Sequence, residues 1–460
     1  MWREMAGPMI CSFENVLRRN MKTKPTVFAN PSGDLRKSPA TSPSPWGEGR
    51  GEGELTSRGD EALIDNLKGF TNYRNSRTVV YCANPLSLSG GGFRFDYSPK
   101  IPHSMCALNL PEHRKAIDKL DEQLVRLLSE RTRHVLSIGE IKHKAGEEIY
   151  APHRERAVLD RVAKLNPGPM TSDQLRAIYR EVMSSALALE KTLSIAYLGP
   201  EATFTHQAAI RRFGSSLKYV PVKTIGDIFT EVQKGRADYG VVPVENSTEG
   251  VVTHTLDMFM DSDLKIVSQI VLQIQYCLAG IGGRKNIKRL HIHPQALGQC
   301  RRWVQQNLPG AEILEASSNA RSAELASKDK GAAAVTGFLA AEKYGLRILE
   351  QDIQDNAANA TRFLVLGRQC SPPTGRDRTS LMISVTDKVG ALYSALAAFR
   401  RAKINLTKIE SRPSKRKAWE YFFFIDCDGH AQDKKVARAI HSLGEHCNFV
   451  KILGSYPNAE

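Results

Sequence analysis

The sequence lacks the long apolar run that a membrane helix requires and the close cysteine pairs that bind metals. No uninterrupted apolar stretch approaches the roughly 20 residues that span a bilayer. The eight cysteines are scattered and none forms a CxxC pair, so a zinc site is not expected. A secretory signal with a central apolar run and a small-residue cleavage site is also missing. We expect a cytoplasmic chain with reduced thiols, no metal and no cofactor.

Signatures of nucleic-acid binding are missing too, although the net charge is +15. The lysines and arginines are dispersed, and no zinc-finger, helix-turn-helix or aromatic RNA-binding pattern accompanies them. An anionic small-molecule substrate explains the basic charge more simply. We therefore expect neither a nucleic acid nor a membrane as a partner.

The chain of 460 residues is long enough for about three domains. Residues 1–104 are rich in Pro, Gly and Ser and show no sustained helical or strand period. Such a composition buries too little apolar surface to offset the entropy of ordering. We interpret 1–104 as a disordered extension; an over-extended gene model, with Met105 as the natural start, would give the same pattern.

Residues 105–192 have the pattern of a helical domain. Apolar residues recur at helical spacing from Ile117 to Ile141, which predicts one helix of about thirty residues ending at Gly146. A second helix is expected after Pro152 and a third from Thr171 onward. Because one long and two short helices cannot bury their apolar faces within so short a segment, the pattern favours a helical dimer.

The remainder predicts two further domains. Residues 193–369 alternate strands and helices, with a second lobe beginning near Ile270 and a return to the first lobe at Phe363–Leu366. Residues 370–378 form a linker. Residues 379–460 show the strand and helix order βαββαβ of a ferredoxin-like domain.

Two polar clusters lie at the ends of apolar, strand-like runs. One is the stretch from Asn359 to Phe363, and the other is Glu245, Asn246 and Ser247. Hydroxyl, amide, carboxyl and guanidinium groups at strand ends suit a small anionic substrate in an α/β cleft. For Asn246 and Ser247 taken alone, a helix cap or a turn is the commoner explanation.

Together with Leu198–Thr205 and His293–Cys300, these clusters resemble the prephenate dehydratase family. The resemblance implies a two-lobed, periplasmic-binding-protein-like α/β domain. It implies that Thr361 hydrogen-bonds the leaving hydroxyl and that Arg362 binds a substrate carboxylate. His293 has two interpretations, a general acid and a structural or rim residue, and we favour the second. The remaining implied substrate-binding residues are Thr203, Thr205, Glu245, Asn246, Ser247 and Gln299.

Two cations of the long predicted helix point the same way. Arg131 and Lys142 are eleven residues apart, which leaves them about 20° apart around a helix. Arg114 is about 100° away from Arg131 around the same helix, so it would reach a shared pocket only across a dimer. Solvated surface charge is the ordinary explanation for such a pair.

Residues 108–191 resemble the all-helical chorismate mutases, which implies a catalytic purpose for these charges. Arg114 would come from the partner subunit, and Arg131 would hold a substrate carboxylate. A carboxyl at the position of Glu190 must be protonated to donate to the substrate ether oxygen, so mutase activity should decline as pH rises. The other implied residues are Lys142 at the ether oxygen, Glu155 at the ring hydroxyl and Arg154 as a supporting charge.

The last segment resembles an ACT regulatory domain at two motifs. The resemblance implies L-phenylalanine as the effector, bound between two ACT domains. The alternative for Gly390 is that it merely starts a helix. The implied effector-binding residues are Gly390, Ala391 and Leu392 in one motif and Glu410, Ser411, Arg412 and Pro413 in the other.

The whole chain thus resembles the bifunctional chorismate mutase/prephenate dehydratases. The expected protein is a homodimer or higher even oligomer that makes phenylpyruvate from chorismate under feedback by phenylalanine. Two alternatives stay open: the helices are only a dimerisation module, or the chain is a non-catalytic amino-acid sensor. Departures from the family pattern are Ala151, Ala186, Ala202 and Ile292.

Overall fold

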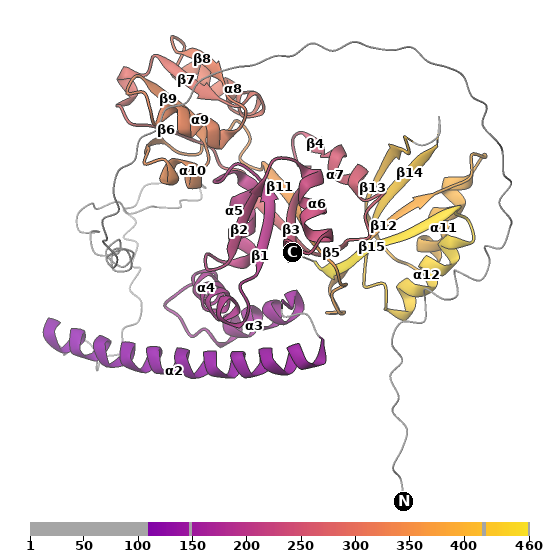
Figure 1. The fold of residues 1–460 in the computed structure, drawn as a ribbon. Coiled ribbons are helices and arrows are strands. Elements are labelled where there is room, and N and C mark those ends of the chain that lie inside the picture. Colours follow the sequence, from indigo (N-terminus) through magenta and orange to yellow (C-terminus); the bar gives the residue numbers. More distant parts are fainter. Residues whose placement is uncertain (1–108, 147–149, 416–419, 459–460) are drawn as a thin grey trace, which may run out of the picture. The chain divides into compact units, whose positions relative to one another are not determined.

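The computed structural model describes residues 109–146, 150–415 and 420–458 (Figure 1). The extension predicted at 1–104 lies outside these residues. The helices are α2 (Leu110–Ala145), α3 (Pro152–Leu165), α4 (Ser172–Glu190), α5 (Phe204–Phe213), α6 (Ile225–Gln233), α7 (Thr253–Met258), α8 (Pro294–Asn307), α9 (Asn319–Ala326), α10 (Phe338–Lys343), α11 (Ala391–Arg401) and α12 (Lys434–Gly444), with a 3-10 turn η3 at Arg284–Asn286. The strands are β1 (Ser194–Leu198), β2 (Lys218–Val222), β3 (Tyr239–Asn246), β4 (Gly250–Val251), β5 (Lys265–Gln273), β6 (Cys277–Gly280), β7 (Arg289–Ile292), β8 (Glu312–Glu315), β9 (Ala332–Thr336), β10 (Arg347–Glu350), β11 (Ala360–Gly367), β12 (Asp377–Ser384), β13 (Leu406–Pro413), β14 (Tyr421–Asp428) and β15 (Phe449–Pro457).

The three predicted helices of the first segment are confirmed. Asn109 and Glu112 form a capping box at the start of α2, and Gly146 ends it in the left-handed conformation with φ 68°. A proline at the first position opens α3, and a second capping box, formed by Thr171 and Gln174, opens α4. Capping boxes, a proline at the first helical position and a terminal glycine are local signals, which explains why the sequence located these ends well.

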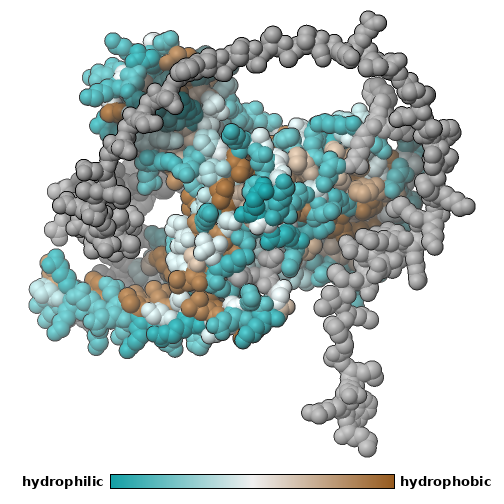
Figure 2. Space-filling view, in the orientation of Figure 1, coloured by the Kyte–Doolittle hydropathy of each residue, from teal (hydrophilic) through white to brown (hydrophobic). Residues whose placement is uncertain are grey.

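The long helix α2 leaves an apolar face exposed. Gly139 is the buried residue of this 36-residue helix, and Figure 2 shows hydrophobic residues along its length. Such a face is what a partner helix normally covers. Its exposed large apolar residues are Leu110, Ile117, Leu120, Leu124, Val125, Leu127, Leu128, Leu136, Ile138 and Ile141.

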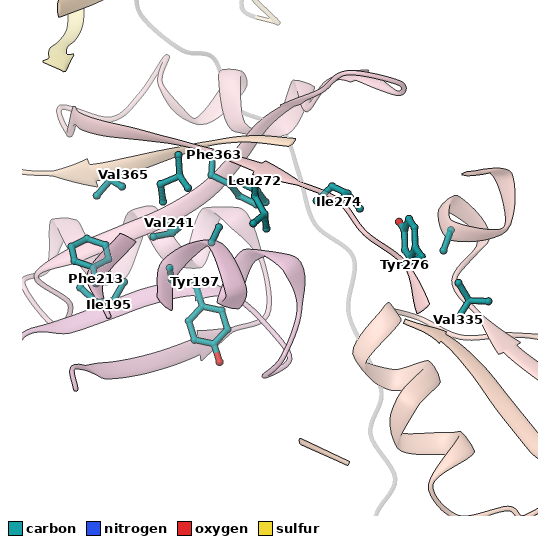
Figure 3. Packing of buried hydrophobic residues seen from close by; sticks show 14 of the residues in the cluster. Ile195, Tyr197, Phe213, Val241, Leu272, Ile274, Tyr276, Val335, Phe363 and Val365 are labelled. Atoms are coloured by element: carbon teal, nitrogen blue, oxygen red, sulfur yellow. The ribbon is translucent and has the colours of Figure 1, made fainter. Parts of the chain in front are cut away.

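The first sheet has the strand order β2-β1-β3-β11-β5, with β4 paired to β3. Strand β11 runs antiparallel between β3 and β5, so the predicted return of the chain at Phe363–Leu366 is confirmed. Val241 belongs to β3, and Phe363 and Val365 belong to β11. Figure 3 shows their side chains in the hydrophobic core on one face of this sheet. The central place of β11 fixes Thr361 beside the end of β3.

The second sheet has the order β10-β6-β9-β7-β8. The chain leaves the first sheet after Gln273 and enters the second at Cys277. The crossover is therefore later than the predicted Ile270, because β5 stays paired with β11 along its length. Ile274 and Tyr276, in the connection, are buried and appear in Figure 3 between the two groups of core residues.

The third sheet has the order β13-β14-β12-β15, and the predicted βαββαβ succession is confirmed. Helices α11 and α12 cover it through a core that includes Leu381, Phe399 and Leu443. Strand β13 is an edge strand of this sheet.

No helix among the described residues is both long enough and apolar enough to cross a membrane. The same part of the chain contains no group of three or more His, Cys, Asp or Glu side chains arranged to hold a metal ion. The candidate chemistry must therefore be sought in the cavities and polar clusters of the described segments.

Candidate functional site

A cavity of about 700 Å³ lies against the three N-terminal helices. This volume is in the range of small-molecule sites. The structure brings five of the six predicted mutase residues to its wall, with Arg114 as the exception. They are Arg131, Lys142, Arg154, Glu155 and Glu190.

Two of these side chains have a buried polar atom without a hydrogen-bond partner among the described residues. The Nη1 of Arg131 and the Oε1 of Glu190 are buried and make no hydrogen bond within the described residues. Buried polar atoms normally find a partner, so such atoms in a cavity indicate a place for a polar ligand. Burial raises the pKa of Glu190, and the nearby charge of Lys142 only partly opposes this.

Gly139 determines where Glu190 lies. A methyl group added at Gly139 would overlap the Glu190 side chain. The absent side chain on α2 thus lets the last turn of α4 approach closely and place the carboxyl in the cavity.

Arg114 is exposed and lies outside the cavity. Its seventeen-residue separation from Arg131 on α2 corresponds to about 25 Å along the helix axis. Within one chain the two cations cannot serve the same substrate. Ala151 and Ala186, the family departures, line the cavity without a polar side chain.

A second polar site follows the ends of β3 and β11. The Nδ2 of Asn246 donates to the Oγ1 of Thr361 at 2.8 Å and to the Oδ1 of Asn359 at 2.9 Å. Asn359 in turn donates to the Oε1 of Gln299 at 2.7 Å, and Gln299 donates to Glu249 at 3.2 Å. Because Gln299 belongs to α8 of the second lobe, this hydrogen-bond chain connects the two lobes.

The other predicted hydroxyls have local roles. Ser247 exchanges hydrogen bonds with the backbone of Ala360, which joins the β3 end to β11. Thr203 caps α5 by accepting from the His206 backbone and donates to the Leu198 carbonyl at 2.9 Å. Thr205 is buried in α5. In the structure, Thr203 thus acts as the N-cap of α5.

Arg362 points away from the Thr361 network. Its Nη1 lies 2.7 Å from Asp426 of β14, its Nη2 donates to the Tyr456 hydroxyl at 2.9 Å, and its Nε donates to Gln269 at 2.9 Å. Neighbouring residues of a strand face opposite sides, so Thr361 and Arg362 cannot share one substrate face. The geometry therefore disfavours the predicted contact between Arg362 and a substrate carboxylate.

Glu245 is also directed toward the third sheet. Its Oε2 lies 2.7 Å from the Nζ of Lys408 in β13 and 3.8 Å from Arg362. Burial alone would lower the pKa of Arg362, but Tyr456, Asp426 and Glu245 raise it overall, so the guanidinium stays charged. Arg362 and Glu245, which adjoin Thr361 and Asn246 in the sequence, thus both form ion pairs with strands of the third sheet.

His293 precedes α8 without capping it through its side chain. Burial lowers the pKa of its imidazole, and Glu315 opposes this shift only in part. A neutral imidazole is a weak proton donor, which agrees with a rim role better than with general acid catalysis.

A second cavity, of about 310 Å³, lies at the start of α11. Gly390 precedes the helix with φ 79°, a conformation that favours glycine. Of the predicted effector residues, Ala391 and Leu392 line this cavity. Asp387 and Lys388 contribute one charge of each sign.

The second predicted effector motif, Glu410 to Pro413, does not line this cavity within the described chain. It occupies the edge strand β13. Its Arg412 instead forms a salt bridge with Asp257 of α7 at 3.1 Å, and Lys415 contacts the same carboxylate at 2.7 Å. These contacts and those of Arg362 link the third sheet to the elements around Thr361.

Sequence reasoning missed two participants in these sites, Glu249 and Asp426. Asn359 belongs to the polar cluster singled out from the sequence, but no role of its own was predicted for it. Glu249 and Asp426 carried no local signal, because each meets its partner only after distant segments have folded together.

Comparison with known proteins identifies all three segments. Residues 113–191 match the family model of chorismate mutase type II, residues 195–371 that of prephenate dehydratase, and residues 379–445 that of the ACT domain. A crystal structure of a prephenate dehydratase from Arthrobacter aurescens in complex with L-Phe is 35% identical with a TM-score of 0.55, covering 58% of this chain and 90% of its own.

Relatives also match across all three segments at once. A bifunctional chorismate mutase/prephenate dehydratase from Aquifex aeolicus is 49% identical over 355 residues, which cover 76% of this chain and 98% of the relative. The enzyme of the same name from Neisseria gonorrhoeae is 45% identical over 351 residues, or 75% of this chain and 96% of the relative. The chain therefore belongs to the family of bifunctional chorismate mutase/prephenate dehydratases.

Proposed function

We propose that this chain rearranges chorismate to prephenate in the helical cavity and converts prephenate to phenylpyruvate at the Thr361 network, under feedback by L-phenylalanine. The observation that carries the proposal is the helical cavity itself. It collects Arg131, Lys142, Glu155 and Glu190 in one space and leaves buried polar atoms without hydrogen bonds. A scaffold that served only for dimerisation would not need such a set.

The first reaction needs no nucleophile. One C–O bond of the substrate breaks while a C–C bond forms, and negative charge grows on the ether oxygen. Arg131 is placed to hold a carboxylate, and Lys142 with a protonated Glu190 would donate hydrogen bonds to that oxygen. The raised pKa of Glu190 supports the protonated form that this role requires.

In the second reaction the ring carboxylate leaves as CO₂ and its bonding electrons enter the ring. Hydroxide then departs and takes up a proton to become water. Asn246 donates to the Thr361 oxygen, so the Thr361 proton remains available for a hydrogen bond to the leaving hydroxyl. Thr361 does not itself ionise, and we assign the Asn246–Asn359–Gln299 chain the role of holding it in place.

The cavity before α11 suits a free amino acid. Asp387 can receive an ammonium group and Lys388 a carboxylate, while Ala391, Leu392 and Phe423 offer apolar contact. The Glu410–Pro413 motif would come from the facing ACT domain of a second subunit. The dehydratase from Arthrobacter aurescens, crystallised with L-Phe, supports phenylalanine as this ligand.

We further propose that the chain is a homodimer or a higher even oligomer in the cytoplasm. The exposed apolar face of α2 and the distance of Arg114 from the cavity both support a second copy of α2 as the missing partner. The buried, unbridged thiols of Cys277, Cys300 and Cys427 support the cytoplasmic assignment.

Phenylpyruvate formation by the purified full chain tests the two reactions. Chorismate and prephenate are supplied separately, each with and without phenylalanine. We expect product from both substrates and suppression by phenylalanine. Product from prephenate alone would make the helices a dimerisation module, and product from neither would favour an amino-acid sensor.

Mixing two inactive variants tests the dimer. Arg114→Ala and Arg131→Ala should each abolish mutase activity while sparing the dehydratase. If Arg114 acts across the dimer, a mixture refolded or co-expressed in equal amounts regains about a quarter of the wild-type sites. Failure to regain activity in mixed dimers would place Arg114 outside the site.

A further inference from the structure

Three buried polar groups meet where helix α3 contacts helix α5 of the dehydratase segment. The Nη2 of Arg212 lies 3.0 Å from the Oε2 of Glu155, and the two side chains are only 19% and 13% exposed. The Nε of Arg212 also donates to the Tyr150 hydroxyl at 2.7 Å. Glu155 and Tyr150 both line the mutase cavity, whereas Arg212 belongs to the other catalytic segment.

Tyr150 fixes this contact mechanically. Its ring packs against Phe213 with centroids 4.8 Å apart and meets Tyr239 edge-on at 5.0 Å. It is buried in the core that belongs to the first sheet. The guanidinium of Arg212, 5.8 Å from the centre of the same ring, is therefore held on two sides.

A buried ion pair of this kind contributes little net stability, because desolvation offsets the attraction between the charges. Stability alone is thus a weak reason for placing an arginine here. The Oε2 of Glu155 also makes no aligned hydrogen bond within the described residues, despite its contact with Arg212. The carboxylate is held by charge and retains the capacity to accept a hydrogen bond from another donor.

We propose that Arg212 is a positioning residue for the mutase reaction: it orients the Glu155 carboxylate toward the substrate hydroxyl. The proposal rests on the function proposed above, in which Glu155 accepts that hydroxyl. It means that the helical site is completed by the dehydratase segment of the same chain. Phe213, Tyr239 and Val267, which also line the cavity, extend this shared wall.

The charge states agree with the geometry. Burial alone would lower the pKa of Arg212, but the attraction of Glu155 and Tyr150 raises it overall, so the guanidinium remains charged. Burial raises the pKa of the Tyr150 hydroxyl; Arg212 lowers it in part and Glu155 raises it further, so the hydroxyl stays neutral. One cation thus faces one carboxylate, with a neutral hydroxyl beside them.

The test uses the full chain carrying Arg212→Met, Arg212→Lys or the control Arg211→Met. Arg211 is the exposed neighbour on the same helix. We expect Arg212→Met to lower mutase kcat/KM by about 10- to 100-fold, the usual cost of a misplaced group. Arg212→Lys should recover most of it, Arg211→Met should behave as wild type, and dehydratase activity should stay unchanged in all three.

A double-mutant cycle with Glu155→Ala distinguishes positioning from a general structural effect. If Arg212 acts through Glu155, adding Arg212→Met to Glu155→Ala causes no further loss. Additive losses would overturn the proposal. Wild-type mutase activity in Glu155→Ala would overturn the function assigned to Glu155. If Glu155→Ala loses mutase activity but Arg212→Met keeps it, only the role of Arg212 is overturned.

Tyr150→Phe provides a second measurement if Arg212→Met does not fold. This variant keeps the aromatic packing and removes only the hydroxyl that accepts from Arg212. We expect a several-fold loss of mutase activity with normal dehydratase activity. Normal mutase activity in Tyr150→Phe, with Arg212→Met unfolded, would also overturn the proposal.

Discussion

The mutase and dehydratase sites of this chain differ in whether their polar side chains are already hydrogen-bonded within the protein. In the helical cavity, buried atoms of Arg131 and Glu190 make no hydrogen bond within the described chain. At the dehydratase site, Asn246, Asn359, Gln299 and Thr361 are already bonded to one another. The first site is organised around charges that a dianionic substrate would satisfy. The second is organised by neutral groups that hold one hydroxyl in place.

The two sites also depend on different neighbours. The mutase cavity includes residues of the dehydratase segment in its wall, and its predicted Arg114 lies too far away to act within one chain. The dehydratase site is instead connected to the regulatory sheet, through Arg362 with Asp426 and Glu245 with Lys408. Regulation by a ligand of the third sheet therefore has a short route to Thr361.

Replacing Thr361 should separate the two sites most strongly. Thr361→Ala removes the only group that we assign to the leaving hydroxyl, so dehydratase kcat should fall by about 10²- to 10³-fold. Phenylpyruvate formation from prephenate measures this. Mutase activity should not change, and Thr361→Ser should restore much of the loss. An unaffected dehydratase in Thr361→Ala would remove Thr361 from the mechanism.

Arg362 provides the next test, because its two possible roles predict different partners. If it acts through the regulatory sheet, Arg362→Met should lower dehydratase activity by about tenfold and weaken inhibition by phenylalanine. Loss of one partner of a buried ion pair costs roughly 3–5 kcal/mol. Thermal unfolding and dehydratase assays with phenylalanine measure both effects.

Asp426→Asn decides between the roles of Arg362. It leaves the active-site face of β11 intact and weakens the 2.7 Å contact with Arg362, together with the hydrogen bond that Asp426 accepts from the Ser380 hydroxyl. Similar, smaller losses in this variant support coupling to the regulatory sheet. If Asp426→Asn has normal dehydratase activity and Arg362→Met has a raised KM for prephenate, Arg362 binds the substrate directly.

The direction in which the Arg362 side chain points could have been predicted from the sequence. Residues 361 and 362 are adjacent on a strand, and the two-residue period of a strand already separates their faces. Motif resemblance grouped them, although strand geometry separates them. The docking partner, Asp426, could not be predicted, because it depends on how the third sheet packs against the first.

The fold was largely predictable because its signals are local. The three helices have capping boxes, an initial proline or a terminal glycine, and the βαββαβ segment shows alternating strand and helix patterns. The crossover between lobes was placed too early at Ile270, since nothing local marks where β5 stops pairing with β11. Contacts between segments, such as Arg212 with Glu155, have no local signal at all.

The pH dependence of the mutase should follow Glu190. Burial raises the pKa of this carboxyl, so the protonated, donating form persists to higher pH than for an exposed glutamate. Mutase kcat should decline several-fold as pH rises through this pKa. In Glu190→Gln, which donates at every pH, the profile should be flat. Initial rates from chorismate measure both profiles, and the same slope in the two proteins would contradict the role of Glu190.

The smallest expected effect concerns backbone strain beside the dehydratase cleft. Ala202 has φ 64°, in the left-handed region that favours glycine. Its backbone N–H donates to the Nδ1 of His206 at 3.0 Å, which holds the turn before α5 in this conformation.

Ala202→Gly should relieve the strain and raise the free energy of unfolding by about 1 kcal/mol. Thermal or denaturant unfolding measures the gain, and Ala202→Val, which strains the turn further, should shift stability the other way. Dehydratase activity should change little in Ala202→Gly if the strain is only structural, whereas a loss of activity with a gain in stability would show that the strained turn helps to shape the cleft.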